Sequence, residues 1–387
     1  MKYKVKLSDV CTIKYGKDHK VLRDGLYPVY GTGGIMRYVN EFIYDKASVL
    51  IPRKGTLSNI FYVEEPFWTI DTLFYTQIDK SKILPKYLYY YLKRFNFDEM
   101  NVGTAVPSLT TALLNELELN IPSLNKQNKI LDLLVPFDKK IETNNAIIAN
   151  LEAQAQAIFK SWFVDFEPFQ DGDFVESELG MIPEGWEVKK IEEVTESLLG
   201  GTPARKKEEF WCGDIPWINS GELNKIRIIE PTEYITKKGL ENSSTKLLPK
   251  KTTVIAITGA TLGQVSLLEI DTCANQSVIG ILENENLPYE YIYPFFLNNI
   301  DMIILNQTGS SQQHINNNDI KNTKMILPIN KVMDAYEQIV SPIYKLVENY
   351  MFQNKVLSQT RDTLLPKLMS GEIRVGQDDI EEIENLL

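Results

Sequence analysis

The feature that most constrains this chain is an internal repeat, because its two halves carry the same features in the same order about 206 residues apart. The stretch ASVLIPRKGTLSNI at 47–60 aligns with TTVIAITGATLGQV at 252–265. Near the end of each half, residues 101–122 align with 306–328, and a glycine and a proline coincide in the two copies. We therefore expect a duplicated folding unit that closes into a pseudo-two-fold body.

Each half begins with a pattern that predicts a mixed globular module. Short β-branched runs, SVLIP and NIFYV in the first half and TVIAI and QVSLL in the second, are separated by Gly, Pro and Asn turns. The stretch PKYLYYYLKRF predicts a helix of about ten residues. Hydrophobic residues make up 43% of the chain, which is enough for real cores. We therefore predict modules of the α+β class at 1–122 and 186–329.

A heptad pattern follows each module and predicts helical spacer regions at 123–165 and 330–372. Pro136 and Pro342 fall at the same step of the two patterns, which predicts a short helix, a break and then a helix of roughly 27 residues, about 40 Å long. We expect the two seams to pack on each other as an antiparallel coiled coil; the alternative is that each packs only on its own module. The seam residues are Ile141, Asn144, Ile148, Leu151, Ile158 and Trp162 in the first half, and Val347, Tyr350, Asn354, Leu357, Leu364 and Leu368 in the second.

The segments outside the modules and spacers are a connector at 166–185 and an acidic C-terminal tail at 373–387. The stretch KSWFVDFEPF at 160–169 ends the first heptad pattern and carries four aromatic residues. It is either a binding patch or packing at the joint between the two halves. Because Trp162 continues the seam, we predict packing, with Asp165 and Glu167 facing solvent or a partner.

A search for catalytic motifs finds none. The two histidines, His19 and His314, lie in different halves, and no metalloprotease, Walker A or nucleophile-elbow motif occurs. The glycine-rich stretch at 31–34 fails the dinucleotide fingerprint because Met36 stands where its third glycine is needed. Three scattered cysteines, the polar N-terminus and the lack of a long apolar run predict a cytoplasmic protein without a disulfide framework or a metal site.

The remaining chemistry lies in turns rich in small, polar and basic residues, which suit base edges and phosphates. Net charge is −11, yet residues 1–122 are net basic, so a local basic face is compatible with the composition. Taken singly, each turn is more often an ordinary loop than a binding site; repetition at matched positions in both halves favours DNA binding. The candidate DNA-binding residues are Thr32, Arg37, Arg53, Lys54, Thr56, Ser58, Thr104 and Ser108 in the first half, and Arg205, Lys206, Lys207, Asn219, Ser220, Thr258, Thr261, Gln264, Ser310, Gln312 and Gln313 in the second.

Four stretches together carry a family resemblance over essentially the whole chain. They are GTAVPSL followed by NELELNIPSLNKQNKI, then NLEAQAQAIFKSWFVDFEPF, IPEGWEVKKIEEV at 182–194, and LLPKLMSGEIRV at 364–375. The ensemble resembles the specificity (S) subunits of type I restriction–modification systems. The resemblance implies two TaqI-methyltransferase-like target recognition domains joined by two long antiparallel coiled-coil helices. The second half departs from the pattern, because it lacks a WFVDFEPF counterpart and Arg361 interrupts its seam.

The resemblance also implies a function. An S subunit binds a bipartite, asymmetric site in double-stranded DNA and positions two methyltransferase (M) subunits, and with them restriction (R) subunits, on that site. S-adenosylmethionine then belongs to the M subunits, ATP and Mg to the R subunits, and no catalytic residue, cofactor or metal to this chain. The lysine pairs 206–207, 237–238 and 250–251 become candidate phosphate contacts. The alternatives are a coiled-coil scaffold without DNA specificity and a DNA enzyme with an unrecognised site.

Overall fold

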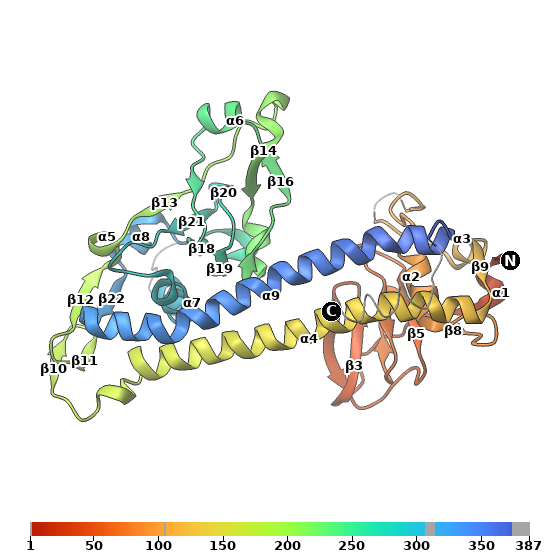
Figure 1. The fold of residues 1–387 in the computed structure, drawn as a ribbon, viewed down its shortest axis with the longest axis horizontal. Helices are drawn as coiled ribbons and strands as arrows, with labels where there is room; N and C mark the ends of the chain where they lie inside the picture. The colour runs from red at the N-terminus through yellow and green to blue at the C-terminus, as the bar shows by residue number, and fades with distance from the viewer. Residues whose placement is uncertain (1, 104–105, 306–313, 374–387) are drawn as a thin grey trace. The chain divides into compact units, whose positions relative to one another are not determined.

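The computed structural model describes residues 2–103, 106–305 and 314–373. The chain divides into two compact units, one formed by Met1–Glu142 with Lys355–Leu387 and the other by Thr143–Asn354. Two long helices, α4 (Leu124–Phe163) and α9 (Asn330–Ser370), each contribute a segment to both units (Figure 1). No helix in the described part of the chain is both long and apolar enough to cross a membrane.

The first unit contains two small sheets and a strand pair. The four-stranded antiparallel sheet has the order β2-β8-β5-β6, and the three-stranded sheet has the order β4-β3-β7 with β3 and β7 parallel. Strand β1 (Lys2–Lys6) pairs with β9 (Glu118–Pro122). The other strands are β2 (Cys11–Tyr15), β3 (Asp24–Gly31), β4 (Gly34–Val39), β5 (Ser48–Pro52), β6 (Phe61–Val63), β7 (Trp68–Thr69) and β8 (Leu73–Ile78), and the short helices are α1 (Leu7–Val10), α2 (Pro85–Leu92) and α3 (Thr111–Asn115).

The core of the first unit forms where α2 and the helical segments cover the four-stranded sheet. Proline at the first position of α2 starts that helix without losing a hydrogen bond that the helix would use. All five residues of β5 are buried, as expected for a central strand covered on both faces. Leu134 of α4 and Leu368 of α9 belong to the same buried cluster as Val49 of β5.

The second unit repeats this plan with additions. Its five-stranded sheet has the order β13-β21-β18-β19-β15, its four-stranded sheet the order β16-β14-β20-β17, and β12 pairs with β22. The strands are β10 (Phe174–Ser177), β11 (Gly180–Pro183), β12 (Glu187–Lys190), β13 (Ser197–Leu199), β14 (Trp211–Ile218), β15 (Arg227–Ile228), β16 (Glu233–Ile235), β17 (Leu247–Leu248), β18 (Thr253–Ala256), β19 (Val265–Leu268), β20 (Thr272–Ala274), β21 (Val278–Ile281) and β22 (Lys324–Leu327). The shorter helices are η1 (Glu167–Phe169), α5 (Ile191–Val194), η2 (Glu208–Phe210), η3 (Ser220–Asn224), α6 (Lys237–Glu241), η4 (Gly259–Thr261), α7 (Tyr289–Leu305) and α8 (Asn317–Asn322).

The strand order confirms the internal duplication. The order β2-β8-β5-β6 of the first unit recurs as β13-β21-β18-β19, and β4-β3-β7 recurs as β16-β14-β20. The parallel pairing of β3 with β7 also recurs between β14 and β20. Low sequence identity hides this agreement, because a strand keeps its place through its pattern of burial and pairing rather than through particular side chains.

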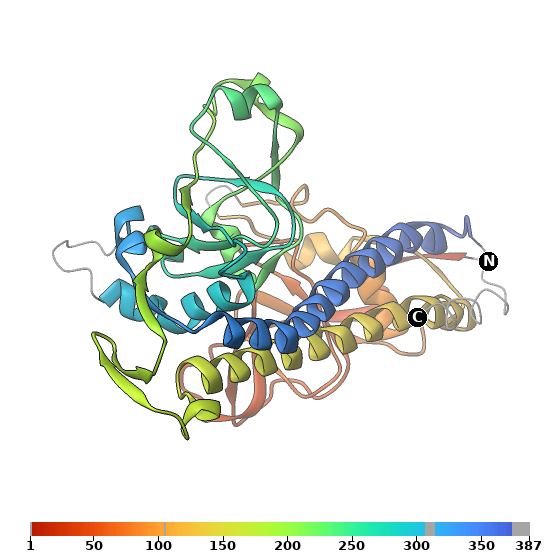
Figure 2. The ribbon, with the colours of Figure 1, turned by 60° about the vertical axis from the view of Figure 1, so that its left-hand side comes forward.

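The spacing of the repeat is not constant along the chain. Strand β14 begins 187 residues after β3, at Trp211 against Asp24, whereas β18 begins 205 residues after β5, at Thr253 against Ser48. The second unit therefore has about 18 additional residues between these strands, where β15 and α6 occur. Figure 2 shows the end of this unit that carries α6 projecting beyond its five-stranded sheet. Strand β15 joins the edge of that sheet, at a position where the described sheet of the first unit ends with β6.

The predicted break after the prolines is wrong. Helix α4 runs for 40 residues through Pro136, and α9 runs for 41 residues through Pro342. An interior proline costs about 3 kcal/mol. Burial of a large apolar side chain contributes about 1.5–3 kcal/mol, and Leu133, Leu134 and Phe137 are all buried around Pro136. Packing on both sides of the proline therefore outweighs the local loss.

Contacts between α4 and α9 run antiparallel within each unit. In the second unit, the Asn144 side-chain amide donates to Gln353 Oε1 at 2.7 Å and Asn354 Oδ1 at 2.8 Å, and the Trp162 and Tyr336 ring centroids are 5.9 Å apart. In the first unit, Arg361 Nη1 lies 2.6 Å from Asp138 Oδ1. The twelve predicted seam residues are all buried or half-buried. The coiled coil itself stays a prediction.

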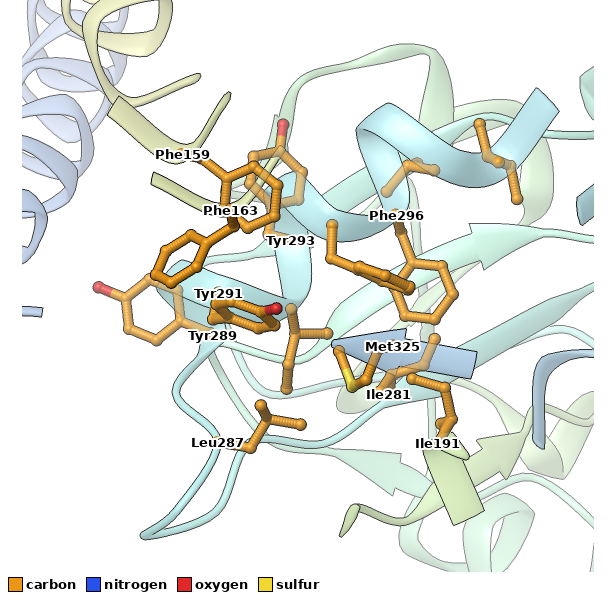
Figure 3. Packing of buried hydrophobic residues seen from close by; sticks show 14 of the residues in the cluster. Phe159, Phe163, Ile191, Ile281, Leu287, Tyr289, Tyr291, Tyr293, Phe296 and Met325 are labelled. Atoms are coloured by element: carbon orange, nitrogen blue, oxygen red, sulfur yellow. The ribbon is translucent and has the colours of Figure 1, made fainter. Parts of the chain in front are cut away.

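The aromatic joint at the end of α4 packs inward, as predicted. Phe163 is 5% exposed, and its ring centroid lies 4.8 Å from those of Tyr291 and Tyr336. Figure 3 shows Phe163 and Phe159 beside Tyr291 and Tyr293 of α7. Half-buried Trp162, Phe166 and Phe169 pack against the same cluster. Asp165 and Glu167 are exposed. The aromatic side chains of this stretch therefore attach the connector to the core of the second unit.

The environments of the three cysteines lead to a prediction about thiol reactivity. Burial raises the pKa of the Cys11 thiol from 9.0 to about 12 and that of Cys273 to about 11, whereas Cys212 is exposed. Because the thiolate is the reactive form, these shifts alone lower the reactive fraction by about a hundredfold or more. We expect one thiol to react promptly with Ellman's reagent at pH 8, and the other two only after urea unfolding. Cys212→Ser should remove the prompt reaction; three prompt thiols in the native protein would contradict this assignment.

Candidate nucleic-acid interface

Three turns of the first unit, which carry the predicted residues Thr32, Lys54 and Ser108, come together at one place. The amide of Gly55 donates to the Pro107 carbonyl at 3.0 Å, and Lys54 forms a β-bridge with Ser108. The Asn59 side chain donates to the Thr32 carbonyl at 2.9 Å. Gly55 has φ +91°, a left-handed conformation that glycine adopts without strain, and this turn brings the 52–59 loop against the other two. Thr32, Lys54 and Ser108 are therefore neighbours although they are far apart in sequence.

The exposed side chains of this loop cluster are Lys54, Thr56 and Ser58, whereas Thr32, Arg53 and Ser108 are half-buried. Arg53 donates from Nη1 to the Asp71 carbonyl at 3.0 Å, and its guanidinium carbon lies 5.3 Å from the Tyr15 ring centroid. A lysine and two hydroxyls beside an oriented arginine form a set of donors suited to phosphate and base edges.

Arg37 has a different environment. It lies in β4, where Nη2 is 2.6 Å from Asp24 Oδ1 and donates to the Leu22 carbonyl at 3.2 Å. These contacts hold the β3–β4 hairpin together. The Arg37 side chain is therefore engaged in contacts within its own hairpin.

A second group of candidates lies where η3 and η4 contact each other in the second unit. Asn219 caps η3 by accepting from the Gly221 amide at 2.8 Å, and Thr261 of η4 donates to the Thr258 carbonyl at 3.3 Å. Half-buried Gln264 follows, and its Oε1 is buried with no hydrogen-bond partner among the residues that the structure describes. Asn219 and Thr261 thus use their side chains to shape the turns, while Ser220 and Thr258 are half-buried beside them.

Arg205 belongs to a separate, tightly organised cluster. Its guanidinium carbon lies 3.8 Å from the Trp211 ring centroid and 4.8 Å from that of Trp217. Both terminal nitrogens pair with the Glu233 carboxylate, and this hydrogen bonding raises the pKa of Arg205. Lys207 lies over the Phe210 ring at 4.8 Å, and Lys206 is exposed.

The other two lysine pairs are engaged with carboxylates of their own unit. Lys237 and Lys238 form exposed ion pairs with Glu241 and Glu209 at 3.7 and 2.7 Å. Such surface pairs contribute about 0–1 kcal/mol, so a phosphate can replace the carboxylate easily. Lys251 is different, because it is 12% exposed and pairs with two glutamates. The geometry therefore argues against Lys251 as a phosphate contact.

Four candidates, Thr104, Ser310, Gln312 and Gln313, lie outside the described residues. Among the residues that are described, no group of three His, Cys, Asp or Glu side chains could hold a metal ion. The second unit also has a surface groove of about 820 Å³ beside β13. Its lining balances Glu192 and Glu196 against Lys246 and Lys321, so it offers no basic surface for phosphates.

The sequence pattern missed a buried ionic cluster in the second unit. Arg227 is 1% exposed and lies 2.6 Å from both Glu152 and Glu269, whose side chains are 5% and 0% exposed. Burial lowers the pKa of Arg227, but the two carboxylates outweigh burial and raise it overall. The only sequence signal was the charge of Glu152 directly after the seam residue Leu151.

Two copies of one α+β module, each followed by a long helix and bearing different side chains on its loops, define a duplicated two-module protein. A family model described as the type I restriction modification DNA specificity domain matches residues 2–153 and 183–349, so both copies are covered. The chain belongs to this family.

Individual relatives agree with that membership. The type I restriction enzyme MjaIX specificity subunit of Methanocaldococcus jannaschii is 29% identical over 344 residues, which span 87% of this chain and 79% of the relative. The HindI specificity subunit of Haemophilus influenzae is 27% identical over 337 residues, spanning 71% of this chain and 73% of the relative. The crystal structure of the type I S subunit from M. genitalium has the same fold, with a TM-score of 0.57 at 17% identity, covering 95% of this chain and 96% of that chain.

Proposed function

We propose that this chain is the DNA sequence-specificity subunit of a type I restriction–modification complex. The observation that carries the proposal is the family match over both duplicated modules, which accounts for two similar scaffolds with different loops. Residues 1–122 and 186–329 are then the two target recognition domains, 123–165 and 330–372 the helical spacers, 166–185 the connector and 373–387 the tail.

In this proposal each recognition domain reads one half of a split, asymmetric site. In the first domain, Lys54, Thr56, Ser58 and Arg53 contact phosphates or base edges through the cluster of three loops. In the second domain, the turns at η3 and η4 and the exposed lysines Lys206 and Lys207 supply the contacts.

The chain itself is proposed to be non-catalytic. Two M subunits carry S-adenosylmethionine and methylate an adenine in each half-site, and R subunits carry ATP and Mg. The target base must leave the duplex stack to reach a methyltransferase active site. The role of this chain is then to fix where the M subunits stand on the DNA.

The proposal is tested by methylome sequencing of cells that express this chain with its cognate M subunit. We expect adenine methylation at one motif made of two short defined parts separated by a gap of unspecified bases. Exchange of residues 1–122 for the first domain of another family member should change one part of the motif only, and exchange of 186–329 the other. Absence of a split motif, with the M–S complex shown to assemble, would refute the proposal.

A further inference from the structure

Arg227 joins the second recognition module to its helices through a strand that has no counterpart in the described part of the first module. It lies in β15, at the edge of the five-stranded sheet and within the additional residues of the second unit. The side chain is 1% exposed, so its charge is removed from water. An arginine is retained at such a position only with paired charges around it, because an isolated buried ion is very unfavourable.

The guanidinium group contacts both long helices and the module at once. Nε donates to Glu152 Oε1 of α4 at 2.6 Å, and Nη1 donates to Glu269 Oε1, directly after β19, at 2.6 Å. Nη1 also donates to the Tyr344 carbonyl of α9 at 3.4 Å, and the guanidinium carbon lies 4.8 Å from the Tyr344 ring centroid. A planar group held from these directions has one allowed orientation.

Further charges extend the contact toward the surface. Lys251 pairs with Glu269 and, at 2.8 Å, with Glu348 of α9, and Lys250 pairs with the same Glu348. Positive and negative groups alternate from Glu152 to Lys250, and the six charges balance. The two carboxylates on the helices, Glu152 and Glu348, therefore keep these partners only while the module stays in this place on the helices.

The first unit is joined differently. There Asp138 of α4 is paired with Arg361, which also belongs to a long helix, at 2.6 Å. The module contributes the neutral Tyr90 hydroxyl, which donates to Asp138, and Lys86 at 4.0 Å. A hydroxyl and a long ion pair restrict orientation less than a buried guanidinium with two carboxylates.

We propose that Arg227 is a positioning residue that fixes the orientation of the second recognition module on α4 and α9, and thereby the number of unread base pairs that the complex accepts. This inference rests on the proposed function. Each additional base pair lengthens the DNA duplex by about 3.4 Å and rotates it by about 34°. A small movement of the module therefore changes which gap length fits. Loss of the Arg227 contacts relaxes the gap without changing the bases read.

The test compares binding of the assembled M–S complex to three duplexes that carry the methylome-defined motif with its natural gap, or with one base pair more or fewer. The first variant combines Glu152→Leu with Arg227→Met and removes one charge of each sign. The second, Arg227→Lys, keeps the positive charge but loses the planar set of guanidinium donors. Lys345→Met is the matched control, because Lys345 is exposed on α9 next to Tyr344.

We expect the double variant to reduce the preference for the natural gap by about tenfold, comparable with the effect of one mismatched base pair. Arg227→Lys should give a smaller reduction in the same direction, and Lys345→Met none. Uniformly weaker binding to all three duplexes, or an unchanged preference, would overturn the positioning role. Failure of the unaltered chain to direct any split motif would instead refute the proposed function.

Discussion

Replacement of Arg227 by methionine is expected to lower the free energy of unfolding of the second unit by about 3–5 kcal/mol, the usual effect of removing one partner from a buried ion pair. Glu269 keeps Lys251 as a partner, but Glu152 loses the one counter-charge that pairs with it among the described residues. The other oxygen of Glu152 already lacks a hydrogen-bond partner within the described part of the chain. The variant therefore buries an uncompensated carboxylate.

A double variant separates loss of pairing from loss of packing. Glu152→Leu combined with Arg227→Met removes both charges, and such hydrophobic replacement of buried pairs is often neutral or stabilising. We therefore expect most of the lost stability to return. Urea unfolding monitored by tryptophan fluorescence reports the stability of this unit. Four tryptophans lie within it, namely Trp162, Trp186, Trp211 and Trp217. Lys345→Met should change stability by less than about 0.5 kcal/mol; equal destabilisation by the single and double variants would contradict the argument.

The second large effect is expected at the aromatic joint. Phe163→Ala should destabilise the second unit by about 3–5 kcal/mol, because it removes a buried ring and leaves a cavity. The ring contacts Tyr291 and Tyr336 at centroid distances of 4.8 Å, and Trp186 at 5.8 Å. Its neighbour Val164 is 47% exposed and provides the control.

The measurement is again urea unfolding, together with near-ultraviolet circular dichroism, to which Trp162 and Trp186 contribute. Val164→Ala should leave the midpoint and the aromatic signal nearly unchanged, within about 0.5 kcal/mol. Similar effects of the two substitutions would show that the joint is not part of the core. A selective effect of Phe163→Ala on DNA binding, with stability unchanged, would instead favour the binding-patch interpretation.

Local patterns account for most of what the sequence predicted. Heptad spacing predicted helical regions at 123–165 and 330–372, and the helices run over Leu124–Phe163 and Asn330–Ser370. This agreement arises because apolar periodicity acts over neighbouring turns. The same local reasoning failed at Pro136, where burial of residues from several elements overcomes the proline.

The ionic cluster could not be predicted, because its members are distant in sequence. Arg227 is 75 residues from Glu152 and 42 from Glu269, and each alone resembles an ordinary surface charge. The candidate loops were easier to find, since glycine and polar turn residues mark them locally. Which basic residues are already paired, as Arg37 is with Asp24 and Arg205 with Glu233, became visible only in three dimensions.

The division of the long helices between two units has a consequence for synthesis on the ribosome. The second unit is one continuous stretch, Thr143–Asn354, but the first unit includes residues from Lys355 onward. Leu365, Leu368 and Met369 of α9 belong to the core of the first unit. At about 5–20 residues per second, these residues are synthesised about 12–50 s after the first module. The half of the protein that is made second can therefore complete its core first, and the N-terminal module exposes apolar surface until the C-terminal helix arrives.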